Sequence, residues 1–473
     1  MEAPNSDKKV HHAIVLPLPL QGHLNPAVNF SLKLASSKNF TITFLTFEFL
    51  HQQITQACPR DNSDDIFSRA RTGLDIRYRA IPDGLPLEFD RAGKGDEFVG
   101  WCLHGGMFDL MDKEIEKLVL NSNPKVDVLI IDSFYPWASK IAKKFGLRSA
   151  SFWTEPALVF NLYYHIHLLK QHGHFDCPDI RKDPIDYIPG VDSIDPQDLM
   201  SYLHDKDIST NIHNSIFQSF QEIRLADYVL CNTVEELESN TILALQDIMP
   251  IFAIGPIFQS ESLENIVSTS LWAKSNCLEW LGTKPNCSVL YVSFGSLANF
   301  TQNDVVEIAY GLMESNVDFI WVLRPRTVLH ESNHLLPMGF EDLVCGRGMV
   351  VPWTNQIAVL SHPAIGGFLT HCGWNSVLDS MWYEVPMLCF PVFSDQFPNQ
   401  KLVVDDWKVG INLCKEKPLR KEITAQIKSF MIQHKGNELR KHISVLRKLL
   451  GNALEDGGSS SKNLDLFIEH LDQ

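Results

Sequence analysis

Short apolar runs alternate with longer helical patterns along this chain, and this alternation restricts the folds that it can adopt. Short runs rich in Val, Ile and Phe are typical of buried strands in a parallel sheet. The first half has such runs at 13–18, 40–46, 126–131 and 149–153, and the second half has them at 288–293, 319–323, 349–351, 366–370 and 387–390. Because helical stretches separate the runs, the sequence predicts an α/β fold with two Rossmann-like, doubly wound domains.

The segment between the two halves is polar, rich in Ser and without clear periodicity, which predicts an interdomain linker. We therefore expect a first domain over 1–257, a linker over 258–276 and a second domain over 277–454. The second domain ends in a strongly helical pattern at 437–454. Residues 455–473 begin with a Gly- and Ser-rich turn and end in an amphipathic piece. A small ligand is expected in the cleft between the domains, outside the carboxyl ends of the strands.

Length, charge and cysteine spacing exclude several classes of protein. The 473 residues are too many for one ordinary core and indicate two or three domains. The formal charge is -16 and no Lys/Arg-rich block occurs, which argues against a nucleic-acid partner. Pro17 and Pro19 break the first apolar stretch, so we expect neither a signal peptide nor a membrane span. The ten cysteines include no C-x-x-C pair, which predicts a reduced compartment, the cytoplasm.

The most informative segment, residues 353–396, reads WTNQIAVLSHPAIGGFLTHCGWNSVLDSMWYEVPMLCFPVFSDQ. Residues 366–370 predict a strand, and 371–376 turn from it into a helix. A glycine turn at a helix N-terminus offers free backbone N–H groups and the positive end of the helix dipole, which together suit a diphosphate. Asp379 lies about one turn further along, where its carboxylate could accept hydrogen bonds from a ribose. For a glycine turn alone, a buried strand–helix unit without a ligand is the alternative.

A second strand end carries a similar signal. Residues 289–296 predict a strand that ends in a small-residue turn at Ser296, and Thr301 and Asp304 have the spacing of a helix capping box. This turn would also be accessible to phosphate. An ordinary tight turn without a ligand is the alternative.

Two residues in the first half are candidates for acid–base chemistry. His23 follows the first apolar run in the stretch PLQGHLNP, and a neutral imidazole is a suitable general base near pH 7. Asp132 follows the run 126–131, and a carboxylate behind a histidine fixes its tautomer and stabilises the imidazolium. On sequence alone, a helix cap or surface position for His23 and a helix N-cap for Asp132 remain open.

The segment 353–396 resembles, without a gap, the signature box of the plant secondary-product UDP-glycosyltransferases of family 1. A looser similarity covers nearly the whole chain, including the surroundings of His23, Asp132 and Ser296. The resemblance implies the GT-B fold, with the acceptor mostly in the first domain, the UDP-sugar mostly in the second, and the last helix returning to the first domain. It also implies inverting transfer of glucose from UDP-glucose to a small lipophilic acceptor, either a flavonoid or other phenolic or a terpenoid.

The resemblance also assigns roles to residues. His23 would be the catalytic base, assisted by Asp132. In the box, Trp353 would stack on uracil, His371 would hold phosphate, and Gln396 is the residue that usually marks a glucose donor. The family usually has Glu where this chain has Asp379. The UDP-sugar-binding residues implied are Ser296, Trp353, Gln356, His371, Trp374, Asn375, Ser376, Asp379, Asp395, Gln396 and Thr154.

The acceptor side has weaker signals. Phe134 and Trp153 lie at predicted strand ends and could line an acceptor pocket, although core packing explains both almost as well. The segments 81–86 and 195–210 have the composition of loops that could rim it. We expect no metal or other cofactor, since no second pair of metal ligands accompanies His371 and its neighbouring Cys. The chain is expected to act as a monomer.

Three other functions were weighed. A nicotinamide enzyme is disfavoured because no G-x-G-x-x-G follows the first strand. A non-catalytic protein that binds nucleotide sugars or metabolites would keep the box but would not need both His23 and Asp132. A glycosidase would need two carboxylates facing each other across a sugar, whereas here the pair is one His and one Asp.

Overall fold

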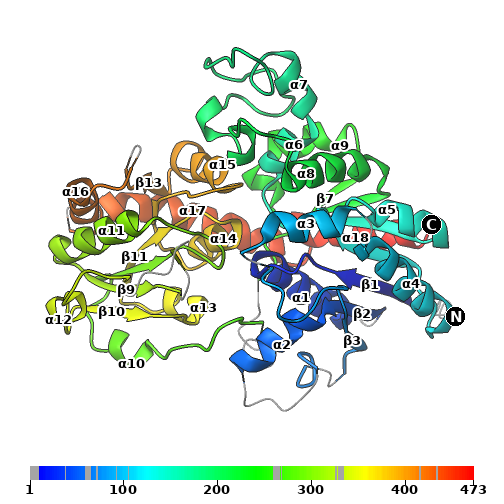
Figure 1. Ribbon diagram of the computed structural model, residues 1–473, viewed down its shortest axis with the longest axis horizontal. Helices are drawn as coiled ribbons and strands as arrows, with labels where there is room; N and C mark the ends of the chain where they lie inside the picture. Colours follow the sequence, from blue (N-terminus) through cyan, green and yellow to red (C-terminus); the bar gives the residue numbers. More distant parts are fainter. Residues whose placement is uncertain are drawn as a thin grey trace, which may run out of the picture.

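The computed structural model describes residues 10–37, 39–58, 65–70, 73–91, 93–104, 106–258, 267, 269–324, 327–328, 335–414, 417–432 and 435–473. These residues form two α/β domains that lie side by side, each around its own parallel sheet (Figure 1). The predicted class, two Rossmann-like doubly wound domains, is confirmed. Of the predicted linker at 258–276, residues 259–266 and 268 lie outside the described residues.

The first domain has a seven-stranded sheet in the order β3-β2-β1-β4-β5-β6-β7. Its strands are β1 (His11–Leu16), β2 (Phe40–Phe47), β3 (Ile76–Ile81), β4 (Val128–Asp132), β5 (Arg148–Trp153), β6 (Tyr228–Cys231) and β7 (Ile251–Ala253). Its α-helices are α1 (Gln21–Ser36), α2 (Glu48–Ala57), α3 (Gly95–Leu103), α4 (Gly106–Asn121), α5 (Ala138–Phe145), α6 (Ala157–Tyr164), α7 (Ile166–Gln171), α8 (Asn211–Glu222) and α9 (Ser239–Gln246). Short 3₁₀ turns are η1 (Pro196–Asp198), η2 (Ser201–Leu203), η3 (Ile223–Leu225) and η4 (Glu235–Leu237).

The second domain has a six-stranded sheet in the order β10-β9-β8-β11-β12-β13. Its strands are β8 (Val289–Ser293), β9 (Asp318–Val322), β10 (Gly348–Val351), β11 (Ile365–Thr370), β12 (Met387–Cys389) and β13 (Gly410–Asn412). Its helices are α10 (Leu278–Leu281), α11 (Gln302–Ser315), α12 (Phe340–Leu343), α13 (Gln356–Leu360), α14 (Trp374–Trp382), α15 (Gln396–Lys401), the π-helical turn η5 (Leu402–Asp406), α16 (Arg420–Met431) and α17 (Lys435–Leu454). The predicted capping box is present at α11, where Thr301 and Asp304 bond each other's backbone N–H groups.

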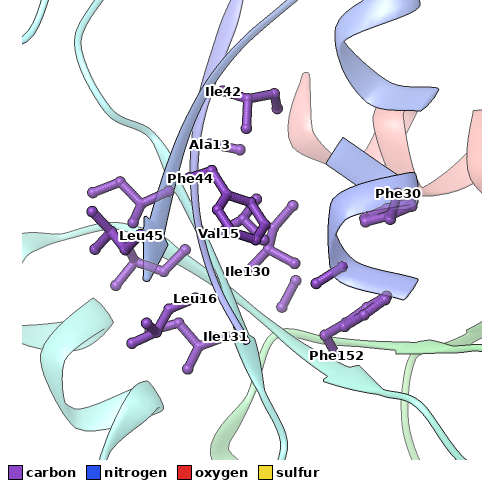
Figure 2. Packing of buried hydrophobic residues seen from close by; sticks show 14 of the residues in the cluster. Ala13, Val15, Leu16, Phe30, Ile42, Phe44, Leu45, Ile130, Ile131 and Phe152 are labelled. Carbon is purple, nitrogen blue, oxygen red and sulfur yellow. The ribbon is translucent and has the colours of Figure 1, made fainter. Parts of the chain in front are cut away.

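Apolar side chains explain why the predicted runs became strands. Every residue of β1 is buried, as expected for a central strand covered on both faces. Figure 2 shows this core, with Phe30 of α1 facing Phe152 of β5, and their ring centroids lie 5.3 Å apart. A separate apolar cluster joins the domains, because residues after β5 and residues of α14, such as Trp153 and Val377, belong to the same core.

The chain ends on the first domain. Helix α18 (Ser459–Leu471) follows α17 and lies beside the first sheet, in red in Figure 1. Its Phe467 is fully buried, with its ring centroid 5.5 Å from that of Tyr228 and 6.1 Å from that of Phe252. Asn463 donates a hydrogen bond to the Ala253 carbonyl at 3.0 Å. These contacts make α18 part of the first domain's packing.

Candidate active site

The carboxyl ends of β1 and β4 bring His23 and Asp132 together. These are neighbouring parallel strands at the point where the strand order reverses, so the loops after them diverge and leave room for a ligand. His23 lies in the first turn of α1, and its Nδ1 is 2.7 Å from Asp132 Oδ2. Asp132 Oδ1 accepts the backbone N–H of Phe134 at 3.1 Å. With both oxygens engaged, Asp132 favours the tautomer with a proton on Nδ1, which leaves the lone pair on Nε2.

The charges around His23 favour its protonated form. Burial lowers the pKa of His23, but the charge and hydrogen bond of Asp132 and the charge of Asp395 outweigh burial, so the pKa is raised above its ordinary value. The Asp395 pKa is itself raised to about 6 by burial, against a hydrogen bond from Asn399 and the charge of His23. Residues of both domains therefore set the basicity of His23.

Three further predicted residues surround the imidazole. Thr154 Oγ1 lies 3.0 Å from His23 Nδ1, and the Phe134 ring meets the His23 ring edge-on at 5.8 Å. Trp153 lies in the core, which is the alternative that the sequence left open. Only 1% of Trp153 is exposed, and its indole N–H donates to the Pro156 carbonyl at 2.9 Å. Its ring packs against Phe134, so Trp153 supports Phe134 from the core and offers no surface to an acceptor.

In the second domain, the predicted uracil and ribose residues lie close together. Trp353 is half-buried, and its ring centroid lies 4.6 Å from that of Trp272. Gln356 Nε2 donates to Asp379 Oδ2 at 2.8 Å and to Ser376 Oγ at 3.2 Å. The shorter Asp379 is therefore tied to the helix that begins at Gln356.

The predicted diphosphate residues lie at the switch point of the second sheet. Strands β8 and β11 are neighbours there, and Ser293 pairs with Thr370 at their carboxyl ends. The turn that carries Ser296 is therefore adjacent to the turn that starts α14 at Trp374. Helix α14 presents its first backbone N–H groups on this side, where an anion is stabilised.

His371 is held between two glycines at this point. A Cβ atom on Gly295 or on Gly373 would lie only 2.4 Å from His371 Nε2. Its Nδ1 is buried and has no hydrogen-bond partner among the described residues. Burial and the charge of Arg324 lower the pKa of His371 to about 4, despite a hydrogen bond to the Ser293 backbone. The free site therefore holds a neutral His371 with one unused ring nitrogen.

Two neighbouring residues at the start of α14 reach the first domain. Asn375 Nδ2 donates to the Gly22 carbonyl at 2.6 Å, next to His23 in sequence. Trp374 is only 3% exposed, and its indole N–H donates to the Asn232 carbonyl at 2.7 Å. The Trp374 side chain is therefore a domain-interface group. Its backbone N–H at the start of α14 remains for a ligand.

Asp395 and Gln396 begin α15 and are both buried. Gln396 Oε1 accepts the backbone N–H groups of Val392 and Phe393 at 2.8 and 3.1 Å. This fixes the amide orientation, and Nε2 is left as a hydrogen-bond donor. Asp395 Oδ2 accepts a hydrogen bond from Asn399 at 2.7 Å. One donor and one partly satisfied carboxylate therefore lie side by side, a combination that suits adjacent sugar hydroxyls.

Sequence analysis missed several residues near the site. Glu155 follows Thr154 and is buried. Arg324 follows the β9 run, is also buried and donates to the Ala298 carbonyl at 2.5 Å, which holds the turn after β8. A charged residue at a strand end was the available signal for both. Ser201 accepts the Ser394 N–H at 2.7 Å, a contact between the domains that no local pattern indicates.

Metal ligands, disulfides and membrane spans are three further features of the described part of the chain. No group of three or more His, Cys, Asp or Glu side chains there is arranged to hold a metal ion. All ten cysteines are free thiols. Of the helices in the described ranges, none is both long and apolar enough to span a bilayer.

Comparisons with known proteins agree with this geometry. The family model for "UDP-glucoronosyl and UDP-glucosyl transferase" matches residues 275–439. The chain is 48% identical over 468 residues to UDP-glycosyltransferase 86A1 of Arabidopsis thaliana, which covers 97% of this chain and 94% of that protein. The structure of Phytolacca americana UGT2 complexed with UDP-2fluoro-glucose and pterostilbene has a TM-score of 0.80 and 26% identity, covering 99% of this chain and 100% of that one. The crystal structure of UDP-glucose: anthocyanidin 3-O-glucosyltransferase in complex with UDP has a TM-score of 0.84 and 25% identity, over 98% and 99% of the two chains.

Proposed function

This chain belongs to the plant UDP-glycosyltransferase family and has its GT-B fold, and from that premise we propose that it transfers glucose from UDP-glucose to a small lipophilic acceptor with inversion at the anomeric carbon. Membership of this family supports only the coarser statement that the chain transfers a sugar from a UDP-sugar. The choice of glucose, the acceptor class and the roles of individual residues are our inference.

The observation that carries the proposed mechanism is the His23–Asp132 pair. The hydrogen bond of 2.7 Å to Asp132 keeps the proton on Nδ1, so Nε2 is the base. As the acceptor oxygen attacks the anomeric carbon, its proton passes to Nε2 and the bond from that carbon to the diphosphate oxygen breaks. UDP leaves with the electron pair, and Asp132 stabilises the imidazolium that forms.

The leaving group would be stabilised by neutral and dipolar groups. We assign the diphosphate to the start of α14, where backbone N–H groups and Ser376 are available, and to Ser296 and His371 from the two neighbouring turns. Trp353 would stack on uracil, with Gln356 and Asp379 towards the ribose. We propose that no metal or other cofactor is required. Full activity in excess chelator is the expected result, and loss of activity there would contradict it.

The preference for glucose rests on Gln396 and its neighbours. Because Gln396 Oε1 is occupied by two backbone N–H groups, its Nε2 is directed to donate, and Asp395 accepts beside it. We assign these two residues and Thr154 to the hydroxyl groups of the sugar. Phe134, which contacts the His23 ring, would meet the acceptor.

The acceptor is proposed to be a flavonoid or other phenolic, or a terpenoid. Two of the similar structures are named for complexes or reactions with pterostilbene and anthocyanidin, which supports a flat, largely apolar acceptor. We further propose that the protein acts as a monomer in the cytoplasm, where its free cysteines would stay reduced.

The test is a mass-spectrometric screen of the purified protein without added metal. UDP-glucose, UDP-galactose and UDP-glucuronate are each offered with mixed flavonoids, simple phenols and terpenoid alcohols. A product heavier by one hexose that forms with UDP-glucose supports the proposal. If UDP raises the melting temperature but no donor gives a product, the alternative of a non-catalytic nucleotide-sugar binding protein is favoured.

A further inference from the structure

One buried carboxyl group near His23 has no part in the mechanism above. Glu155 comes directly after Thr154 at the end of β5, and only 8% of it is exposed. Its Oε2 is shielded from solvent and has no hydrogen-bond partner among the described residues. Buried polar atoms are nearly always paired, so an unpaired acceptor in a binding site indicates a partner that binds there.

The groups around Glu155 place it at the sugar end of the site. Asp395 and Asp132 interact with its carboxyl group electrostatically, and so do the phenol groups of Tyr163 and Tyr202. These neighbours come from α15, β4, α6 and η2, so elements of both domains converge on one carboxyl group. Asp395 is the residue proposed above to accept from a sugar hydroxyl.

A second buried glutamate nearby has a different environment. Glu238 is 6% exposed, and its two oxygens accept the backbone N–H groups of Ala157 and Leu158 at 3.0 and 2.8 Å. The Thr233 hydroxyl also donates to it. Glu238 is therefore a saturated structural clamp at the start of α6. Glu155, in the same part of the fold, has the burial of such a clamp without its partners.

We propose that Glu155 is a further substrate-recognition residue whose carboxyl group binds a hydroxyl of the transferred hexose, beside Thr154 and Asp395. This inference rests on the proposed function, because it requires a hexose donor.

The protonation of Glu155 fits this ligand. Burial, with the charges of Asp395 and Asp132, raises its pKa well above the ordinary range, which favours the neutral acid. A carboxyl group in its neutral form, which this shift favours, both donates and accepts a hydrogen bond, as a hydroxyl does. Gln has nearly the same shape and also offers one donor and one acceptor side, whereas Met fills the space without either.

The experiment measures the dissociation constants of UDP-glucose and of UDP by calorimetry. In E155M we expect UDP-glucose to bind roughly five- to tenfold more weakly, the effect of one lost hydrogen bond, with UDP unchanged. In E155Q both constants should stay within about threefold of wild type. E238Q is the control: a lower melting temperature with an unchanged ratio of the two constants is expected. If E155M does not fold, E155A is used.

Two outcomes overturn the proposal. One is a ratio of the UDP-glucose and UDP dissociation constants that is unchanged in E155M. The other is a loss of UDP-glucose affinity in E155Q as large as that in E155M. Failure of the proposed function gives a different result, because wild-type protein would then bind UDP without any gain from the glucosyl group.

Discussion

A histidine becomes a useful base only when its surroundings fix the tautomer, and Asp132 does this for His23. We expect H23A to lower kcat by on the order of 10²–10⁴-fold, the usual contribution of a general base, with the UDP dissociation constant unchanged. His11 and Asp127 form a similar pair elsewhere in the first domain, with 2.6 Å between His11 Nδ1 and Asp127 Oδ2. H11A is therefore the control. H11A should lower the melting temperature but not kcat. Equal kcat in H23A and wild type would remove His23 as the base.

The pH dependence of kcat/KM reports on the same pair. His23 must be neutral to act as the base, and its pKa is raised despite burial, so activity should fall as the pH drops through a value above 6.5. D132N removes the charge and hydrogen bond that raise this pKa and leaves the effect of burial. We therefore expect the acidic limb of the profile to move to lower pH while the plateau falls. A limb at the same pH in D132N would show that another group titrates.

Gln396 allows a sharper test of donor recognition than truncation does. Because Oε1 accepts from Val392 and Phe393, Q396A would disturb the loop as well as the site. Q396E keeps an acceptor for the loop but replaces the Nε2 donor with an oxygen. We expect kcat/KM for UDP-glucose to fall roughly 10- to 100-fold in Q396E, with UDP binding changed little. Similar kcat/KM values in Q396E and wild type would exclude donation by Nε2.

At the scale of elements, the glycine turns around His371 combine two constraints. Gly295 has φ +70°, and a Cβ there would lie 2.4 Å from the His371 ring. Gly339 has φ +73°, but nothing lies within 4 Å of its Cβ position. Both G295A and G339A should lose stability through backbone strain, but only G295A should displace His371. We expect UDP affinity to fall at least tenfold in G295A alone, measured by calorimetry. Equal UDP affinity in both variants would contradict this role of the glycine.

The elements also show what local patterns can and cannot predict. Long apolar runs such as 13–18 and 126–131 were recognised because burial on both faces leaves a continuous signal, and they correspond to β1 and β4 within two residues. Four strands of the two sheets, β3, β6, β7 and β13, were not predicted. Strand β3 is an edge strand in which only the first and last residues are buried, and the other three have only three or four residues. Strands of three or four residues carry a weak signal: β10 and β12 are as short and were predicted at 349–351 and 387–390, whereas β6, β7 and β13 were not.

The same limit applies to the site. Asp132, the last residue of β4, and His23, in the first turn of α1 after β1, were found because parallel strands bring their ends together. The orientation of Trp374 towards Asn232 and the contact of Ser201 with Ser394 depend on how the two domains dock. No local pattern encodes that docking, so these two contacts were not predicted from the sequence.

For the whole molecule, the two domains are joined by specific bonds as well as by apolar packing. Asn375 donates a hydrogen bond to the Gly22 carbonyl beside His23, so the segment 353–396 and the first turn of α1 are in direct contact. The chain's last helix strengthens this arrangement, because α17 leads back from the second domain and α18 packs on the first. The packing of α18 therefore bears on the stability of the whole fold.

Phe467 is the residue through which α18 is tested. It is fully buried against Tyr228 and Phe252, whereas its neighbour Leu466 is 44% exposed. F467A should lower the free energy of unfolding by about 3–5 kcal/mol, and L466A should change it by less than about 0.5 kcal/mol. The UDP dissociation constant of folded F467A should match wild type, since the residues proposed to bind UDP lie in the other domain. Chemical denaturation and calorimetry measure the two quantities, and a stable F467A would mean that α18 contributes little to holding the domains.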